Sequence, residues 1–593
     1  LTRSCTKPIR NNWRDPSHMI ISRQAMVFIL TGLLIIAPAL ASQSDDLISD
    51  GNVYYGQGMF REAIESFERA IELEPSNAAA WYNKGVSLFK VGQVDEAIAS
   101  YEVAIGLDPR NSDYWYNKGN ALYSKNLLNE AYAAYDVAIQ LDPYDVLAWM
   151  AKGNVLSDQQ HYDDAIRAYD AAIQIDPDNE ETWFAKGNAH YNQENYREAV
   201  SAYEIALQKD SKDSKAWYNK GNAQYNLGDL TGALKSYEMA LAYNPKDAIA
   251  YTNKGMALAD LERYDDAIDA YKAALNLDPT DLKALTSLGQ VYTKLKQYDN
   301  AVRAFQMALR LNKTDSSLWK SIGDVLMLEK RYDEALAAYE QAIALNRMSS
   351  GAWIGKGTAL NNLARYREAL GVFEIACSMS PLYATAWVGK GNSLAGLGQF
   401  SEADSAYEAA LQLDPRNSMA LAGKSKNLIT TGDPDTALQS LELAIAADPT
   451  NLALLTRKAE IYETLGRYQE ALDVWNSVAI NESDPDLARR GKAITLVRAG
   501  KKDEALALFR EVLALNPGSG ILYEQYGDVL ALSGDTAGAE NSYRKAMEIQ
   551  PNLTGIVLKI KALESVQKET PLGIFPILSG FFIGYVLLSR RRG

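Results

Sequence analysis

Asparagine and aromatic side chains recur along this chain at one fixed spacing. Asn120, Asn154, Asn188 and Asn222 stand 34 residues apart, and aromatic residues lie four positions before or three positions after three of them: Tyr116, Tyr123, Phe184, Tyr191, Tyr218 and Tyr225. A carboxamide donates and accepts hydrogen bonds, as a peptide backbone does, and aromatic rings add apolar contact at a low entropic cost. This pattern predicts binding of a ligand. The alternative is that asparagine is simply a common residue at this position of the repeat and binds no ligand.

Residues that could carry catalysis or hold a metal are few. His161 and His190 are the histidines after residue 41, and Cys5 and Cys377 are the cysteines of the chain. Two cysteines build neither a disulfide framework nor a cysteine metal site. The tripeptide that begins at Gly423 resembles part of a phosphate loop, but Ser418 replaces its first glycine. We therefore predict no catalytic residue, no metal site and no cofactor, so the protein is not expected to be an enzyme.

The charge of the chain argues against nucleic acid as a partner. Its 60 basic and 75 acidic residues give a net charge of −15. Residues 1–41 hold five basic residues and one acid, so the remainder has 55 basic and 74 acidic residues, or −19. A surface this acidic repels a phosphate backbone.

The asparagines belong to a 34-residue repeat, which we count as fifteen units over residues 44–553. Proline recurs at position 32 of the repeat, as at Pro109 and Pro143, and alanine fills position 20 of all fifteen units, from Ala63 to Ala539. Each unit predicts two helices separated by a turn, and eight units have glycine at that turn, where positive φ is tolerated. Small residues at positions 8, 20 and 27 allow close packing, and Trp at position 4 with Tyr or Phe at position 24 fills the gaps between units.

Lysine recurs at position 7 in eleven units, from Lys84 to Lys492. A column of stacked lysines could bind an extended anion. The interpretation we favour is that their aliphatic stems pack on the repeat while the ammonium groups reach solvent or neighbouring acids.

These positions resemble the tetratricopeptide repeat family. Trp217, Gly221, Tyr225, Ala233, Tyr237, Ala240 and Pro245 match its pattern in one unit, and the resemblance covers about 510 of the 593 residues. It implies an all-α fold, a right-handed superhelical solenoid of helix-turn-helix repeats, whose concave face typically binds peptides or proteins.

The resemblance also implies where the asparagine column lies. Positions 2, 5, 9, 12 and 13 of each first helix face the groove in this family, so the four asparagines and six aromatic residues above are the expected ligand-binding groove. The column is similar to the asparagine-lined grooves of some family members, including O-linked N-acetylglucosamine transferases, although no transferase domain follows. Met150 and Phe184 stand where the basic clamp of some relatives would need Lys or Arg.

The repeats change character towards the C-terminal end. The tryptophan position becomes Leu421, Leu455 and Arg489, and the glycine position becomes Ser425, Ala459 and Ala493, so we expect a joint near residue 415 or 480. Residues 554–567 predict one more helix that caps the array.

The first 41 residues predict targeting and not fold. Residues 1–18 are polar and basic, and we interpret them as a non-native or disordered extension that precedes Met19. Residues 19–41 have a basic start, a short apolar run and the small-x-small exit Ala39-Leu40-Ala41, which predicts a signal peptide. An uncleaved signal anchor is the alternative.

The other end predicts attachment to a membrane. Residues 572–588 are apolar except for Ser579, and Arg590 to Arg592 follow. Seventeen residues span roughly 25 Å as a helix, just short of a hydrocarbon core, and the arginines predict a cytoplasmic end. The segment also resembles archaeal C-terminal sorting signals, in which the tail is replaced by a lipid.

Together these features predict a membrane-tethered scaffold with its repeats outside the cell. Its partners would be proteins or extended peptides held in the groove. The alternative is a structural or assembly component of the envelope that binds glycans or surface-layer subunits.

Overall fold

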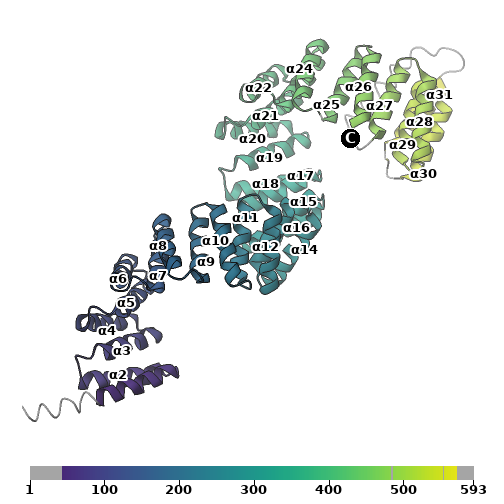
Figure 1. The fold of residues 1–593 in the computed structure, drawn as a ribbon. Coiled ribbons are helices and arrows are strands. Elements are labelled where there is room, and N and C mark those ends of the chain that lie inside the picture. The colour runs from purple at the N-terminus through teal and green to yellow at the C-terminus, as the bar shows by residue number, and fades with distance from the viewer. Residues whose placement is uncertain (1–42, 450, 482–484, 552, 554, 570–593) are drawn as a thin grey trace, which may run out of the picture. The chain divides into compact units, whose positions relative to one another are not determined.

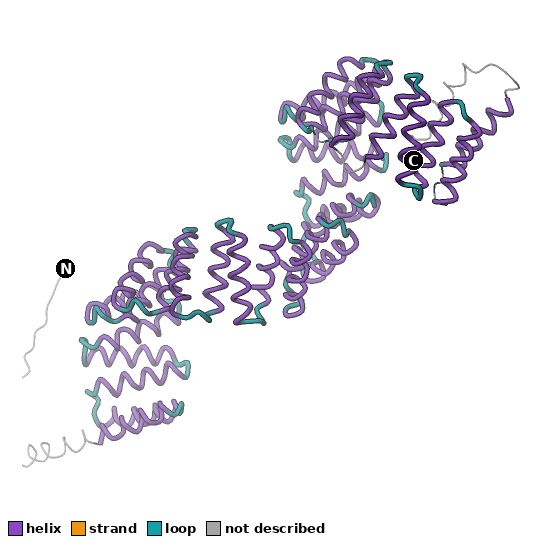
Figure 2. The backbone as a smooth tube through the Cα atoms, turned by 45° about the vertical axis from the view of Figure 1, so that its right-hand side comes forward, coloured by secondary structure: helices purple, strands orange, loops and turns teal. Residues whose placement is uncertain are grey.

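The computed structural model describes residues 43–449, 451–481, 485–551, 553 and 555–569. Every regular element in this part of the chain is an α-helix, and consecutive helices are joined by short turns (Figure 2). Each helix packs mainly against its neighbours in sequence. The predicted all-α solenoid of helix-turn-helix repeats is therefore confirmed.

The chain divides into two compact units, residues 1–291 and 292–593, and the boundary falls inside α15. The joint that the sequence predicts near residue 415 or 480 stays a prediction. The first unit starts with a helix over residues 43–56, and most of its further helices are labelled in Figure 1. They are α2 (Phe60–Leu73), α3 (Ala78–Lys90), α4 (Val94–Leu107), α5 (Ser112–Ser124), α6 (Leu128–Leu141), α7 (Val146–Asp158), α8 (Tyr162–Ile175), α9 (Glu180–Asn192), α10 (Tyr196–Lys209), α11 (Ser214–Asn226), α12 (Leu230–Tyr243), α13 (Ala248–Asp260), α14 (Tyr264–Leu277) and α15 (Leu282–Lys294).

The second unit continues the alternation of first and second helices. Its elements are α16 (Tyr298–Leu311), α17 (Ser316–Leu328), α18 (Tyr332–Leu345), α19 (Ser350–Asn362), α20 (Tyr366–Met379), α21 (Ala384–Gly396), α22 (Phe400–Leu413), α23 (Ser418–Thr431), α24 (Pro434–Ala447), α25 (Leu452–Thr464), α26 (Tyr468–Asn481), α27 (Pro485–Arg498), α28 (Lys502–Leu515), α29 (Gly520–Ser533), α30 (Thr536–Ile549) and α31 (Ile556–Glu569).

A glycine and a tyrosine hold the two helices of one repeat together. Tyr203 on α10 is 1% exposed, and its ring lies against Gly187 on α9. A Cβ atom added to Gly187 would stand 2.6 Å from the Tyr203 ring, so no larger residue fits without a shift. Gly85, Gly119, Gly153, Gly221 and Gly255 meet the tyrosine of their own repeat in the same way. The predicted close approach at position 8 is confirmed.

The turn inside each repeat needs one residue with positive φ. Glycine supplies it at eight positions, including Gly92 and Gly228, as the sequence predicted. The other seven repeats place an ordinary residue there, at the cost of crowding its Cβ atom. These are Asn126, Gln160, Glu194, Glu262, Lys296, Lys330 and Ala364, with φ between 57° and 63°.

Tryptophan and lysine connect each first helix to the preceding repeat. The indole Nε1 of Trp183 donates to the carbonyl of Pro177 at 3.1 Å, and the Lys186 ammonium lies 5.2 Å from the Trp183 ring centre. That ammonium also pairs with Asp170 on α8 at 2.5 Å. Ten lysines at this repeat position pair with the acid 16 residues earlier, which confirms for these ten that the ammonium groups reach neighbouring acids.

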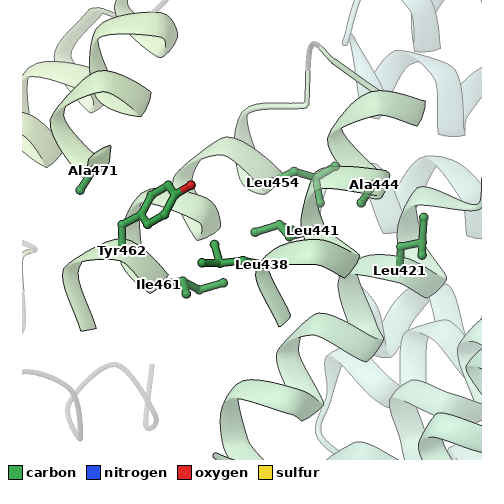
Figure 3. Close-up of a cluster of buried hydrophobic side chains, with 8 residues drawn as sticks. All are labelled: Leu421, Leu438, Leu441, Ala444, Leu454, Ile461, Tyr462 and Ala471. Carbon is green, nitrogen blue, oxygen red and sulfur yellow. The ribbon is translucent and has the colours of Figure 1, made fainter. Parts of the chain in front are cut away.

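The divergent repeats keep an apolar core with different side chains. Leucine replaces the tyrosine of position 24 at Leu441, which is fully buried between Leu438, Ile461 and Leu454 (Figure 3). Ser425 replaces the glycine of position 8, and its hydroxyl donates to the carbonyl of Ala437 at 2.8 Å. A smaller side chain at position 24 therefore accompanies a larger one at position 8.

The predicted capping helix corresponds to α31, whose Ile556 and Leu563 are buried against α30. Residues 1–18, the signal sequence at 19–41 and the apolar segment at 572–588 lie outside the described residues. Within the described residues, no helix combines the length and the hydropathy that crossing a membrane requires.

Candidate binding groove

The four predicted asparagines lie at equivalent places on four first helices of the first unit: α5, α7, α9 and α11. Each is half-buried, as are the six predicted aromatic residues. Neighbouring first helices contact one another along this row. The asparagines therefore follow the packing direction of the repeats.

The carboxamide oxygen of each asparagine is used inside the repeat. Asn188 Oδ1 accepts the hydroxyl of Tyr203 at 2.8 Å. The same bond joins Tyr135 to Asn120, Tyr169 to Asn154 and Tyr237 to Asn222, at 2.8–2.9 Å. A buried tyrosine hydroxyl needs such a partner, so the asparagines stabilise the fold whether or not they bind a ligand.

Two of these oxygens accept a second bond from the following repeat. Asn219 Nδ2 donates to Asn188 at 2.9 Å, and Asn253 Nδ2 donates to Asn222 at 3.0 Å. A carbonyl oxygen has two lone pairs, so both are occupied at Asn188 and Asn222. The sequence suggested that the column offers donors and acceptors alike, but the structure reserves these acceptors for the protein.

The amide nitrogens are placed differently. Hydrogen bonding from Asn120 and Asn222 counteracts part of the raised pKa of Tyr116 and of Tyr218, which stand one turn earlier. Met150 and Phe184 occupy that place before Asn154 and Asn188 and offer no hydroxyl. Among the described residues, neither Asn154 Nδ2 nor Asn188 Nδ2 donates a hydrogen bond, and only their oxygens have partners. These two groups are donors available to a ligand.

A groove of about 460 Å³ opens at this point, and we call it the asparagine groove. It brings together the predicted residues Tyr123, Asn154, Asn188, Tyr191 and Asn222 with residues that sequence reasoning missed. The full lining is Tyr123, Asn154, Ser157, Asp158, Tyr169, Ala185, Asn188, Tyr191, Asn192, Tyr203, Asn219 and Asn222.

The other predicted residues do not line the groove. The rings of Tyr116, Phe184 and Tyr218 pack against the buried tyrosines of their own repeats, with ring centres 5.9–6.1 Å apart. Asn120 and Tyr225 also lie outside the lining. Their part in ligand binding stays a prediction.

A second ladder joins position 12 of one first helix to position 13 of the next. Tyr123 Oη donates to Asp158 at 2.5 Å and Tyr225 Oη to Asp260 at 2.5 Å, while Asn226 Nδ2 donates to Tyr191 Oη at 3.0 Å. The sequence contains the signal for these pairs, because each tyrosine is followed 35 residues later by Asp or Asn.

Carboxylates dominate the electrostatics around the groove. Burial first and Asp158 second raise the pKa of Tyr123 to about 12, and burial with Asp260 does the same for Tyr225. At the start of α9, burial first and then Asp213, Asp210 and Glu181 raise the pKa of Glu180 to about 7. Burial and neighbouring carboxylates both favour the protonated form of this carboxyl.

The histidines do not form a catalytic cluster. His190 takes a position that is leucine in most repeats, and its Nδ1 is buried without a partner. Burial and the nearby Lys186 lower its pKa. His161 precedes α8 at the turn. Cys377 is buried, and the described residues contain no group of three or more His, Cys, Asp or Glu that could hold a metal ion.

The fold and the groove define a class of protein: a helical repeat solenoid with a polar groove on its first helices. Family models identify the repeat. The chain belongs to the tetratricopeptide repeat family. Models described as tetratricopeptide repeat match residues 50–112, 87–146, 184–248, 218–282, 252–316, 286–352, 320–384, 354–418, 388–451 and 490–553, and two related models match residues 153–194 and 428–493.

Several solved structures are similar to parts of this chain. YrrB, described as a TPR protein with an unusual peptide-binding site, is 25% identical over 32% of this chain and 96% of its own, with a TM-score of 0.29. MamA is 26% identical over 28% of this chain and 96% of its own, with a TM-score of 0.27. Yeast Tom70 is 17% identical over 76% of this chain and 99% of its own, with a TM-score of 0.32. No curated protein sequence matches the chain.

Proposed function

We propose that this protein is a non-catalytic scaffold that holds an extended segment of a partner protein in the asparagine groove. Tetratricopeptide repeat scaffolds typically mediate protein binding. The observation that carries the proposal is the pair of free donors, Asn154 Nδ2 and Asn188 Nδ2, on the groove wall. Backbone carbonyls of an extended peptide are acceptors that would complement them.

The spacing of the donors fits an extended chain. They lie one repeat apart on α7 and α9, which contact each other, and packed helix axes stand roughly 8–10 Å apart. An extended chain advances about 3.3 Å per residue. Carbonyls three residues apart would therefore reach successive asparagines, while the rings of Tyr123 and Tyr191 contact the side chains between them.

The proposed location is the outer side of the cell membrane. It rests on the signal-like residues 19–41 and on the apolar residues 572–588 with the arginines that follow them. A protease added to intact cells or spheroplasts should then digest the repeats. Full protection while the membrane is intact would place them inside.

A second candidate is an envelope component that binds glycans or surface-layer subunits. A groove lined by carboxamides and tyrosines also suits sugar hydroxyls, which accept and donate hydrogen bonds. Affinity capture from envelope extracts with the full-length chain separates the two candidates. Recovery of peptides or soluble proteins supports the first candidate, and recovery of glycans or surface-layer subunits supports the second.

The decisive variant changes the donors without unfolding the repeat. Asn154→Asp with Asn188→Asp keeps an oxygen for Tyr169 and Tyr203 but replaces each NH₂ by an acceptor that repels a carbonyl. Asp324 already accepts from Tyr339 in this way, at 2.9 Å. We expect the double variant to bind a captured neutral peptide about tenfold more weakly, in a calorimetric titration.

The matched control is Asn392→Asp in the second unit, where the oxygen accepts from Tyr407 at 2.8 Å. It makes the same chemical change away from the asparagine groove, so binding should be unchanged. Normal binding by the Asn154, Asn188 double variant would mean that the partner is held elsewhere.

A further inference from the structure

The charged groups around the asparagine groove show which peptides it accepts. The groove-side positions of α5, α7, α9, α11 and α13 hold one cation, Lys215, and four carboxylates: Asp113, Asp158, Glu181 and Asp260. Of these residues, Asp158 lines the asparagine groove. Burial is the first cause of the raised pKa of Tyr116, Tyr123 and Tyr225, and Glu181, Asp158 and Asp260, respectively, raise it further.

The lysines of the first helices do not neutralise these carboxylates. Lys152, Lys186 and Lys220 lie under the tryptophans of their helices and pair with Asp136, Asp170 and Glu204 of the preceding second helices, at 2.5–2.8 Å. Their positive charge is therefore offset by acids of the second helices. Lys215 is the one cation at these groove-side positions, and among the described residues no ion pair joins it to these carboxylates.

Two carboxylates are also fixed in position. Asp158 and Asp260 each accept a tyrosine hydroxyl from the preceding repeat, through one oxygen. Asp158 lines the groove, one helical turn beyond Asn154. A carboxylate held in this way presents a ready acceptor to an ammonium or guanidinium group and loses little entropy on binding.

Building on the proposed function, we propose that the segment held in the asparagine groove is basic, with lysine or arginine side chains at intervals of about three residues. Its carbonyls accept from Asn154 and Asn188, and its cationic side chains pair with Asp158, Glu181 and Asp260. The donor column supplies affinity, and the carboxylates supply selectivity.

The test uses three fluorescein-labelled dodecapeptides that differ in charge alone: (Thr-Ser-Lys)₄, (Thr-Ser-Gln)₄ and (Thr-Ser-Glu)₄. Fluorescence anisotropy with the full-length chain at low salt should show the lysine peptide binding at least tenfold more tightly than the glutamine peptide, and the glutamate peptide binding most weakly. The preference should shrink at about 0.5 M salt, because surface charges are then screened.

A triple variant, Asp158→Asn, Glu181→Gln and Asp260→Asn, assigns the preference to these carboxylates. It keeps an oxygen for Tyr123 and Tyr225, so the ladder persists. We expect it to weaken the lysine peptide about tenfold and to leave the glutamine peptide unchanged. The matched control removes three acids from the second helices α2, α4 and α6, through Glu62→Gln, Glu96→Gln and Glu130→Gln, and should change neither affinity.

The outcomes separate the two proposals. If the peptides bind with equal affinity, or if the control weakens the lysine peptide as much as the triple variant does, the charge preference is wrong while peptide binding stands. If none of the three peptides binds, both the preference and the proposed function fail. Retained lysine selectivity in the triple variant also overturns the assignment to these carboxylates.

Discussion

Tyr203 donates its hydroxyl to the carboxamide oxygen of Asn188 at 2.8 Å, from the second helix of a repeat to the first. The bond divides the asparagine into two functional halves. Its oxygen belongs to the fold, whereas its nitrogen faces the asparagine groove. A test of ligand binding must therefore change the nitrogen and spare the oxygen.

Replacing Asn188 by alanine should destabilise the repeat. The Tyr203 hydroxyl would be left buried without an acceptor, which costs about 1–3 kcal/mol. Asn188→Asp should cost less than alanine, since Asp528 accepts from Tyr543 in the native protein at 2.7 Å. Because repeats couple mainly to their neighbours, hydrogen exchange of α9 and α10 is the suitable measurement. Equal protection in the wild type and in Asn188→Ala would show that the bond contributes nothing.

The Asn–Tyr pair could have been found in the sequence. Seven of the nine repeats with tyrosine at position 24 carry Asn or Asp fifteen residues earlier, whereas one of the six repeats with Phe, Leu or Trp there does so. The association indicates a polar contact of the hydroxyl. The sequence could not show that Asn219 and Asn253 occupy the second lone pairs, because that contact depends on how far successive repeats rotate.

The contact of Gly187 with Tyr203 predicts a steep cost for one methyl group. Gly187→Ala places a Cβ atom 2.6 Å from the Tyr203 ring, and overpacking of this kind costs about 1–3 kcal/mol. The loss should be visible as weaker hydrogen-exchange protection of α9 and α10. In a Tyr203→Leu background the same change should cost less, as the native pair of Ser425 and Leu441 suggests.

Gly106→Ala is the matched control. Gly106 lies inside α4 with no atom within 4 Å of an added Cβ. Alanine is a better helix former than glycine by up to about 1 kcal/mol, so this change should stabilise α4. Destabilisation by both changes would show that the effect at Gly187 is not a clash.

Ala364→Gly should stabilise its repeat. Ala364 has φ 57° in the turn between α19 and α20, a conformation that costs an L-residue about 1 kcal/mol and costs glycine little. The converse change, Gly228→Ala at φ 81°, should destabilise by a similar amount. Chemical denaturation, monitored by hydrogen exchange of α19 and α20, measures the gain in stability. Weaker hydrogen-exchange protection in Ala364→Gly would mean that the Ala364 methyl group makes a packing contact that stabilises the repeat by more than the positive φ costs.

The sequence predicted the boundaries of the repeats and of their helices well, because these depend on local packing. The period of 34, the alanine at position 20 and the glycine turns each report packing within a helical hairpin. The turn residues Glu194 and Ala364 show its limit, because their types do not disclose positive φ and the register alone places them in the turn. The raised pKa of Glu180 could not be predicted from the sequence either. It arises from burial and from carboxylates such as Asp213, which lies 33 residues away in the chain.

Glu180 predicts how stability should vary with pH. Its pKa is about 7 in the folded protein, raised by burial first and by Asp213 next, against an ordinary value of 4.5. Between these two values the folded state holds a proton that the unfolded chain has released, so this group favours folding as the pH falls from 8 to 5 and disfavours it as the pH rises through 7. Glu180→Gln removes the ionisable group and should raise the melting temperature at pH 8 while changing it little at pH 5.

The control Glu130→Gln, at the exposed start of α6, should shift the melting temperature equally at both pH values. If Glu180→Gln behaves like this control, Glu180 is ionised at pH 8 without penalty and the acidic groups around it do not crowd one another.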